Sequence, residues 1–235
     1  MKKIISTLTV MFLITSISIA QNDNGYIGIS FGPSIPMSDL ASKSADNSAA
    51  GYANSGAIFD ISFNYKLGDG DFGIVALLRG QANAIDAQEL ANSAASLYPG
   101  ILWTVESDPW SIGGFLFGGY ATFPISNKAS FDAKAMLGFL SATSPELHIT
   151  ASNQASSVWV ISNEATASSF AYCISSGFKF ELGDKMYLLS NIDYLASNPE
   201  FLNRETLASD GSITTDTWSQ DMKTLNFSIG IAYKL

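Results

Sequence analysis

The chain has 235 residues, a formal net charge of −9 and one cysteine. An internal disulfide is therefore excluded, and Cys173 lies inside a predicted strand, which indicates a small buried side chain. Charged residues make up only 14% of the sequence, against about 25% in a typical soluble domain. The length suits one domain.

The chain opens with a predicted secretory signal peptide over residues 1–20. Lys2 and Lys3 form a basic start, residues 4–19 are mostly apolar, and Ser18-Ile19-Ala20 fits a small-x-small cleavage site. The apolar stretch is shorter and richer in hydroxyl groups than the ~20 apolar residues that a spanning helix needs. We expect cleavage after Ala20, which leaves one β-barrel domain over 21–235.

Eight segments alternate apolar and polar side chains, the pattern of a strand with one apolar face. They are predicted near 25–35, 57–67, 72–82, 110–123, 129–141, 169–182, 186–195 and 224–235. The last segment alternates without a break and runs to Leu235, as in the closing strand of an outer-membrane barrel.

The fourth segment allows two assignments. Its apolar face is formed either by Phe115, Phe117 and Phe123 or by Trp110, Ile112, Leu116 and Tyr120. A bulge at Gly118-Gly119 would switch the phase between them.

The connections alternate between short and long. Turns at 68–71, 124–128 and 183–185 are short, whereas the segments 36–56, 83–109, 142–168 and 196–222 are long. The predicted fold is all-β: an eight-stranded antiparallel up-and-down transmembrane β-barrel. Three short periplasmic turns and four long extracellular loops would connect its strands, with both termini in the periplasm.

Alternation alone also fits a soluble lipocalin-type barrel, which packs its apolar side chains inward. The membrane version is favoured because the polar face is small and in places glycine-rich, as a narrow lumen requires. The apolar face carries aromatic side chains near strand ends, as expected for an interfacial girdle: Tyr65, Phe72, Phe123, Phe131, Phe180, Tyr187 and Tyr233.

The chain resembles the OmpA-like, "porin family" outer-membrane β-barrel proteins of Gram-negative bacteria. The resemblance rests on the opening strand 25–33, the strand exit Ala142-Thr-Ser-Pro145 and the closing strand. It implies an outer-membrane location, contact with membrane lipid and lipopolysaccharide, and recognition of the C-terminal strand by the barrel-assembly machinery. The chain departs from the usual terminal Phe, with Leu235 last and Tyr233 two residues earlier. No further periplasmic domain is expected after this strand.

The long loops are acidic. Without Lys2 and Lys3 the chain holds ten basic and 21 acidic side chains, a net charge of −11. The four long segments hold 13 acids and only two bases, Lys43 and Arg204, so they carry all of this excess. The acids indicate solubility and cation-bridged contact with lipopolysaccharide, or a site for a cation or basic ligand. They argue against nucleic acid as a partner, and no loop has a recognisable metal-ligand spacing.

The polar face predicts a charged lumen, with acids and bases mixed. Its residues are Asp60, Asn64, Lys66, Arg79, Gln81, Asp132, Lys134, Lys179, Glu181, Asn191 and Asp193. Because an unpaired charge is costly in a low-dielectric interior, we expect ion pairs and hydrogen bonds. Eight strands enclose a space that side chains can fill, so a plugged, salt-bridged lumen is predicted. A narrow or gated pore is the alternative.

The loops are predicted to be partly ordered. Residues 85–97 could form a helix capped by Asp86 and ended by Pro99-Gly100, and 158–161 could pair with 147–149 as a hairpin. Surface recognition would then use exposed tryptophans as candidate contact residues: Trp103, Trp159 and Trp218. Packing within their own loops or anchoring at the membrane interface is the alternative for each.

The residues favour a structural or surface-interaction protein that has no cofactor, recognises an unknown extracellular ligand and is not an enzyme. A small passive channel for ions or small solutes is the alternative. An envelope enzyme acting on lipid or peptide is a weaker one, because Ser144, Glu146 and His148 would share a face only in an extended segment.

Overall fold

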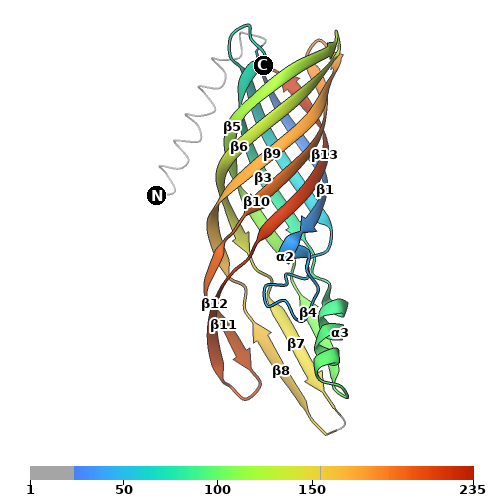
Figure 1. Cartoon of the computed structure of the whole chain (residues 1–235), viewed down its shortest axis with the longest axis vertical. Helices are drawn as coiled ribbons and strands as arrows, with labels where there is room; N and C mark the ends of the chain where they lie inside the picture. The colour runs from blue at the N-terminus through green and yellow to red at the C-terminus, as the bar shows by residue number, and fades with distance from the viewer. Residues whose placement is uncertain (1–23, 154) are drawn as a thin grey trace.

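The computed structural model describes residues 24–153 and 155–235. The predicted signal peptide, 1–20, lies outside them. Eight strands form a closed antiparallel barrel in the order β1-β13-β10-β9-β6-β5-β3-β2 (Figure 1). Each barrel strand pairs with the next barrel strand along the chain, and the last pairs with the first, which confirms the up-and-down topology.

The barrel strands overlap all eight predicted segments. Their bounds are β1 (Gly25–Met37), β2 (Gly56–Lys66), β3 (Phe72–Asn83), β5 (Trp110–Ser126), β6 (Ala129–Thr143), β9 (Thr166–Gly183), β10 (Met186–Ser197) and β13 (Met222–Lys234). No helix in the described part of the chain is long and apolar enough to cross a membrane.

The two faces of the barrel wall differ as the alternation predicts. Outward side chains such as Ile29, Phe115 and Ile229 are exposed and apolar, whereas inward side chains are buried. In β5, Phe115 and Phe117 point outward, while Leu116 is fully buried. The first of the two assignments for this strand therefore holds.

The predicted bulge at Gly118-Gly119 is wrong, because β5 stays in register with β3 and β6 through both residues. The irregularity lies between Pro124 and Ser126. Gly118 has another role: an ideal Cβ there would lie 1.9 Å from the carbonyl oxygen of Ala135. The glycine thus lets β5 and β6 approach each other closely.

Tyr187 was expected in the outward aromatic girdle, and this assignment is also wrong. Its ring lies 5.6 Å from that of buried Tyr26, in an edge-to-face arrangement. β10 is irregular between Met186 and Tyr187, where its pairing with β9 shifts. The alternation of inward and outward side chains in the middle of β10 therefore does not extend to the first residues of this strand.

A second sheet projects beyond the barrel (Figure 1). We call it the projecting sheet; its strand order is β12-β11-β8-β7-β4. The strands are β4 (Leu102–Ser107), β7 (Leu147–Ser152), β8 (Ser157–Ser162), β11 (Glu200–Ala208) and β12 (Ile213–Ser219). The β7–β8 hairpin is the one predicted from the sequence.

Two helices belong to the loop region. α3 (Ala87–Leu97) begins after Asp86, whose carboxylate accepts a hydrogen bond from the Glu89 N–H at 3.1 Å, so the predicted helix and cap are confirmed. α2 (Ser38–Ala41) is a short turn of helix after β1.

We expect Gly118→Ala to lower the free energy of unfolding by about 1–3 kcal/mol, because the added methyl group would collide with the β6 backbone. Urea titration of the refolded barrel measures this. Gly80→Ala is the matched control, since an ideal Cβ at Gly80 has no atom within 4 Å. Equal effects of the two substitutions would contradict the close approach of β5 and β6.

Candidate functional site

The centre of the lumen is held by one arginine between two aspartates on different strands. Arg79 Nε and Nη2 donate to the carboxylate of Asp60 at 2.8 and 2.6 Å. Arg79 Nη1 and Nη2 donate to Asp193 at 2.5 and 3.0 Å. All three side chains are nearly inaccessible to solvent. Because β2, β3 and β10 each supply one member, this central ion cluster ties one side of the barrel to the other.

Further polar groups complete the surroundings of this cluster. Asn226 Nδ2 donates to Asp193 Oδ1 at 3.0 Å. Lys134 is half-buried, and its Nζ donates to Asn191 Oδ1 at 3.1 Å. The free space beside the cluster is a cavity of about 20 Å³, lined by residues including Ser30, Ser175 and Ser228. A volume of this size holds about one water molecule.

A second cluster of polar side chains lies in the lumen, nearer the short turns. Asp132 accepts hydrogen bonds from Thr122 Oγ1 at 2.6 Å and from Tyr26 Oη at 3.4 Å. The Lys179 ammonium lies 3.7 Å from Asp132 and above the rings of Tyr26 and Tyr187, 5.1 and 5.3 Å from their centres. This second cluster fills the lumen with aromatic surface as well as charge.

The remaining predicted lumen residues are distributed along the barrel. Gln81 is buried and donates to Asn83 at 2.8 Å. Asn64 is fully buried and makes no side-chain hydrogen bond within the described residues. Lys66 and Glu181 are half-buried, and Glu181 pairs with Lys234 at 2.9 Å. Ion pairs thus join five of the predicted residues within the two clusters: Asp60, Arg79, Asp193, Asp132 and Lys179.

The loop end of the lumen is apolar and is covered by the segment 38–55. Leu40 is fully buried in a cluster that includes Trp110, Leu140 and Phe201. Trp110 Nε1 donates to the Gly51 carbonyl at 2.9 Å, which ties the segment to β5. Sequence reasoning missed this plug; its only signals were Leu40 and Tyr52, both buried, in a loop whose other residues are polar or small.

A polar latch holds the covering segment to the next loop. Lys43 Nζ donates to Asp86 at 2.5 Å and to Asn54 Oδ1 at 2.7 Å. The Lys43 ammonium and then the Glu89 backbone N–H hold the pKa of the Asp86 carboxyl below its usual value. Asp86 therefore both caps α3 and fastens residues 38–55.

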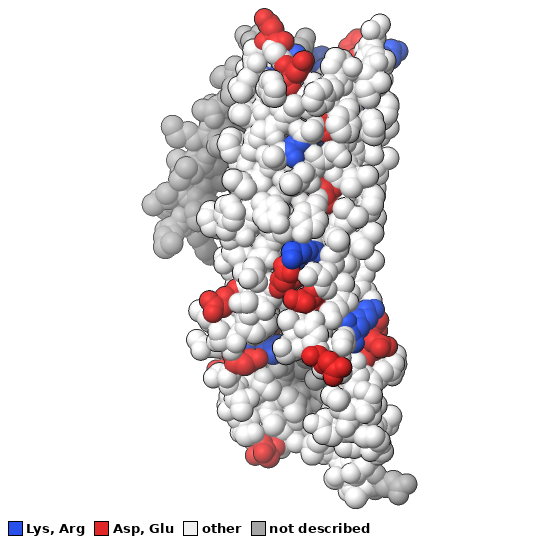
Figure 2. Space-filling model, viewed as in Figure 1, with Lys and Arg blue, Asp and Glu red and all other residues white. Residues whose placement is uncertain are grey.

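The charges of the loop region are unevenly distributed. Figure 2 shows charged side chains gathered where the barrel meets the projecting sheet, others along the barrel and at its opposite end, and few on the surface beyond the junction. The stretches 90–105 and 149–163 contain no Lys, Arg, Asp or Glu. The acids are therefore unevenly distributed over the loops. The count of acids per loop did not determine their positions within each loop.

The three candidate contact tryptophans have different environments. Trp103 is half-buried, and its ring centre lies 6.0 Å from that of Tyr98. Trp218 stacks on Phe201 at 4.7 Å, with the Arg204 guanidinium 4.1 Å from its ring centre. Trp159 is 40% exposed and has no aromatic or cation–π contact within the described residues.

Ser144, Glu146 and His148 do not assemble into a Ser-His-acid arrangement. His148 Nε2 lies 2.7 Å from Glu146 Oε1. Ser144 is buried, and its Oγ accepts from the Ala165 N–H at 3.0 Å. No group of three or more metal-ligating side chains occurs among residues 24–153 and 155–235.

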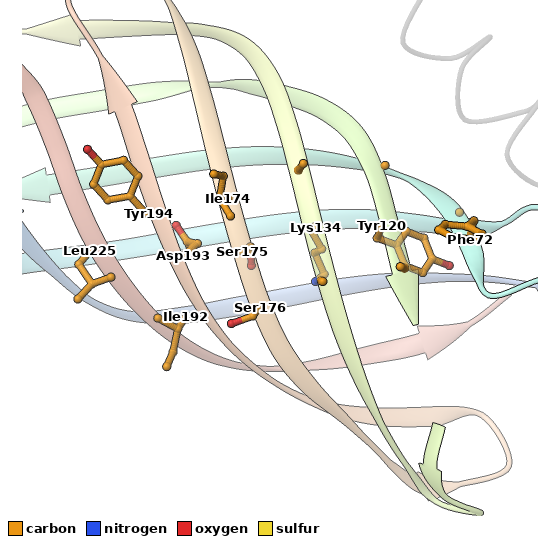
Figure 3. Close-up of a pocket in the computed structure, with 15 residues that line it drawn as sticks. Phe72, Tyr120, Lys134, Ile174, Ser175, Ser176, Ile192, Asp193, Tyr194 and Leu225 are labelled. Atoms are coloured by element: carbon orange, nitrogen blue, oxygen red, sulfur yellow. The ribbon is translucent and has the colours of Figure 1, made fainter. Parts of the chain in front are cut away.

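The outer wall carries one broad hollow of about 670 Å³ (Figure 3). Small residues such as Gly119, Ala133 and Ala135 lie in it, between larger side chains including Phe72 and Ile192. It belongs to the apolar outer surface of the barrel and contains no arrangement of groups suited to catalysis.

Comparison with known proteins identifies the architecture. No family model matches the chain, and no curated protein matches it. A solved structure of a major outer membrane protein from Thermus thermophilus matches with a TM-score of 0.50 at 6% identity, over 89% of this chain and 98% of that one. The chain has the fold of an outer-membrane β-barrel.

Two further solved structures match along most of this barrel. Neisserial surface protein A matches at 11% identity, over 90% of this chain and 97% of its own, with a TM-score of 0.49. Ail, the attachment invasion locus protein of Yersinia pestis, matches at 14% identity, over 89% and 97%, with a TM-score of 0.45.

Removing the arginine of the central ion cluster should be strongly destabilising. Arg79→Ala leaves two buried carboxylates without a counter-charge, so we expect a loss of about 3–5 kcal/mol in the free energy of unfolding. Urea titration measures it. Arg204→Ala, which removes a partly exposed pair with Asp216 and the contact with the Trp218 ring, should cost less, about 1–2 kcal/mol. A similar small loss for Arg79→Ala would contradict the central role of the cluster.

Acid should loosen the latch. Since the Asp86 pKa is lowered in the folded state, the contribution of the pair is fully present above the unfolded value of about 3.9 and is lost as pH falls through the folded value. The pair is partly exposed, so this contribution should stay below about 1 kcal/mol.

Hydrogen exchange of the Ala53 amide, which donates to the Leu40 carbonyl at 2.9 Å, measures the release of the latch. After correction for intrinsic rates, protection should hold from pH 6 to about pH 4 and fall as the pH drops further, through the lowered pKa of Asp86. Lys43→Met should remove most of that change. An unaltered pH dependence in Lys43→Met would exclude the latch as its source.

Proposed function

We propose that this protein is a closed outer-membrane barrel that acts through its projecting sheet, which contacts partners outside the cell. The observation that carries the proposal is the contrast between the two ends of the molecule. The lumen is filled by ion clusters and covered by the 38–55 segment, while five loop strands form an ordered sheet beyond the barrel. A channel has no need of such a sheet.

The filled lumen supports a non-conducting role. The central ion cluster crosses the barrel, and the cavity beside it holds about one water molecule. An ion that passed this point would have to separate Arg79 from a carboxylate in a low-dielectric interior. The narrow-pore alternative therefore requires the cluster to open.

The outer wall supports a membrane location. In the protein alone, more than half of the surface of several apolar side chains is exposed, including Phe31, Leu78, Phe139 and Ile174. Membrane lipid would cover this apolar surface. In outer-membrane barrels the long loops face outward and the short turns face the periplasm. By that rule the projecting sheet lies outside the cell and both ends of the barrel chain lie in the periplasm.

The proposal includes three kinds of partner. Membrane lipid and lipopolysaccharide would surround the apolar wall, and the acids near the barrel mouth would meet lipopolysaccharide through bridging cations. The barrel-assembly machinery would recognise β13. An extracellular ligand would bind the projecting sheet. No step of this function requires a catalytic residue or a cofactor.

Cysteine labelling in intact cells tests the orientation. A membrane-impermeant maleimide should label Val158→Cys, which replaces a side chain that is 51% exposed on β8. Asp184→Cys, in a short turn, should be labelled only after the outer membrane is permeabilised. The native Cys173 is buried and should stay unlabelled in both backgrounds. The reverse labelling pattern would exclude a projecting sheet outside the cell.

A further inference from the structure

Trp159 lies in a regular row of side chains on one face of the projecting sheet. Antiparallel pairing sets Trp159 opposite Thr150, and Thr150 opposite Thr104. The neighbouring row pairs Ser157 with Ser152, and Ser152 with Leu102, which is 69% exposed at the edge of the same face. Directly paired residues project from the same face of a sheet. The tryptophan and these four serines and threonines form the Trp159 platform, an indole bordered by four hydroxyl groups.

The platform is open, whereas the opposite face is open at Val158 on β8, which is 51% exposed, and is covered only at β4, next to α3. Trp159, Thr104 and Ser157 are exposed, and Thr150 and Ser152 are partly exposed. Trp103 alternates with Thr104 along β4, so it points the other way, toward Tyr98 at the end of α3.

The polar groups of the platform are unused. Within the described residues, none of the four hydroxyls makes a side-chain hydrogen bond, and the Trp159 ring has no aromatic or cationic neighbour. Trp218, by contrast, is already engaged by Phe201 and Arg204. A surface aromatic beside free donors and acceptors can make apolar and hydrogen-bonded contacts together.

The charge around the platform restricts its ligand. No Lys, Arg, Asp or Glu occurs in 149–163, which contains the platform residues of the hairpin; the nearby acid Asp210 follows Ser209, whose N–H donates to the Trp159 carbonyl at 2.9 Å. The next row toward the barrel pairs Glu106 with His148, and Glu146 lies 2.7 Å from that histidine. These acids would repel an anionic ligand, and the platform has no carboxylate or ammonium group of its own for an ionic partner.

We propose that the Trp159 platform binds an uncharged oligosaccharide outside the cell. The inference rests on the proposed function, since it needs the projecting sheet to face outward. One face of a pyranose ring presents C–H groups that can stack on the indole, while its hydroxyls exchange hydrogen bonds with serine and threonine. The ligand class follows from this match of one aromatic surface, neutral hydroxyls and adjacent acids.

Calorimetric titration of the full mature protein tests the site, with the protein folded in a detergent that has no sugar headgroup. The probes are neutral hexasaccharides of glucose, mannose and N-acetylglucosamine, and a sulfated glucose oligosaccharide. At least one neutral probe should bind, and the sulfated one should not. Trp159→Ala should weaken binding about tenfold or more, since aromatic anchors dominate such contacts.

Matched variants separate a sugar site from other roles of the tryptophan. Thr104→Val and Thr150→Val preserve shape but remove hydroxyls, so each should weaken sugar binding while leaving any membrane anchoring by Trp159 unchanged. Ile213→Ala, which shortens an exposed side chain on β12, should bind as the wild type does. Heat-modifiable gel mobility checks that every variant is folded.

Three results would overturn the inference: no neutral probe binds the folded protein, Trp159→Ala binds as tightly as the wild type, or the sulfated probe binds more tightly than the neutral ones. These outcomes are separable from failure of the proposed function. Labelling of Val158→Cys in intact cells reports on orientation alone, and sugar binding in detergent does not depend on it.

Discussion

The structure depends on how an eight-stranded barrel fills its own interior. A lumen of this width must be filled by side chains, and a polar face turned inward must pair every charge it carries. Arg79 meets this requirement by bonding to carboxylates from β2 and β10 at once. The cluster therefore joins distant parts of the wall, and in the function proposed here the same interaction both stabilises the barrel and blocks conduction.

Closure of the barrel at the loop end follows from a different interaction. Leu40 enters an apolar cluster with Trp110 and Phe201, which brings the 38–55 segment over the mouth. Three loops are then free to build a sheet instead of a channel entrance. The stretches 90–105 and 149–163 of these loops are uncharged, and most of the acids lie nearer the barrel, although Asp210 is in the turn between β11 and β12.

The barrel could be predicted from sequence because alternation reports directly on a two-faced wall. The eight segments, the short turns, the β7–β8 hairpin and the Asp86 cap were all predicted from local patterns. Each depends on neighbours in sequence: a strand on residues two apart, and a cap on residues three apart. Predictions failed where contacts between residues distant in sequence determine the local structure. At Gly118 this contact is the close approach of β6, and at Tyr187 it is the shift in the pairing of β10 with β9.

The site was less predictable for the same reason. Burial of Leu40 depends on Trp110 and Phe201, and the strand β12 exists because β11 offers it an edge. The charged residues of the lumen were recognisable by their face, but which acid meets Arg79 depends on barrel register and strand tilt. The sequence also contained three similar tryptophans, and only the folded loops distinguish exposed Trp159 from Trp103 and Trp218.

Single-channel recording in a planar bilayer tests the closed lumen most directly, using the refolded protein with Arg79→Ala and Lys134→Ala as lumen variants. The account predicts a silent bilayer for the wild-type protein, with folding verified by heat-modifiable gel mobility. Discrete conductance steps in the wild type, with a size or ion preference that shifts in the two variants, would contradict it and make the charged lumen a pore.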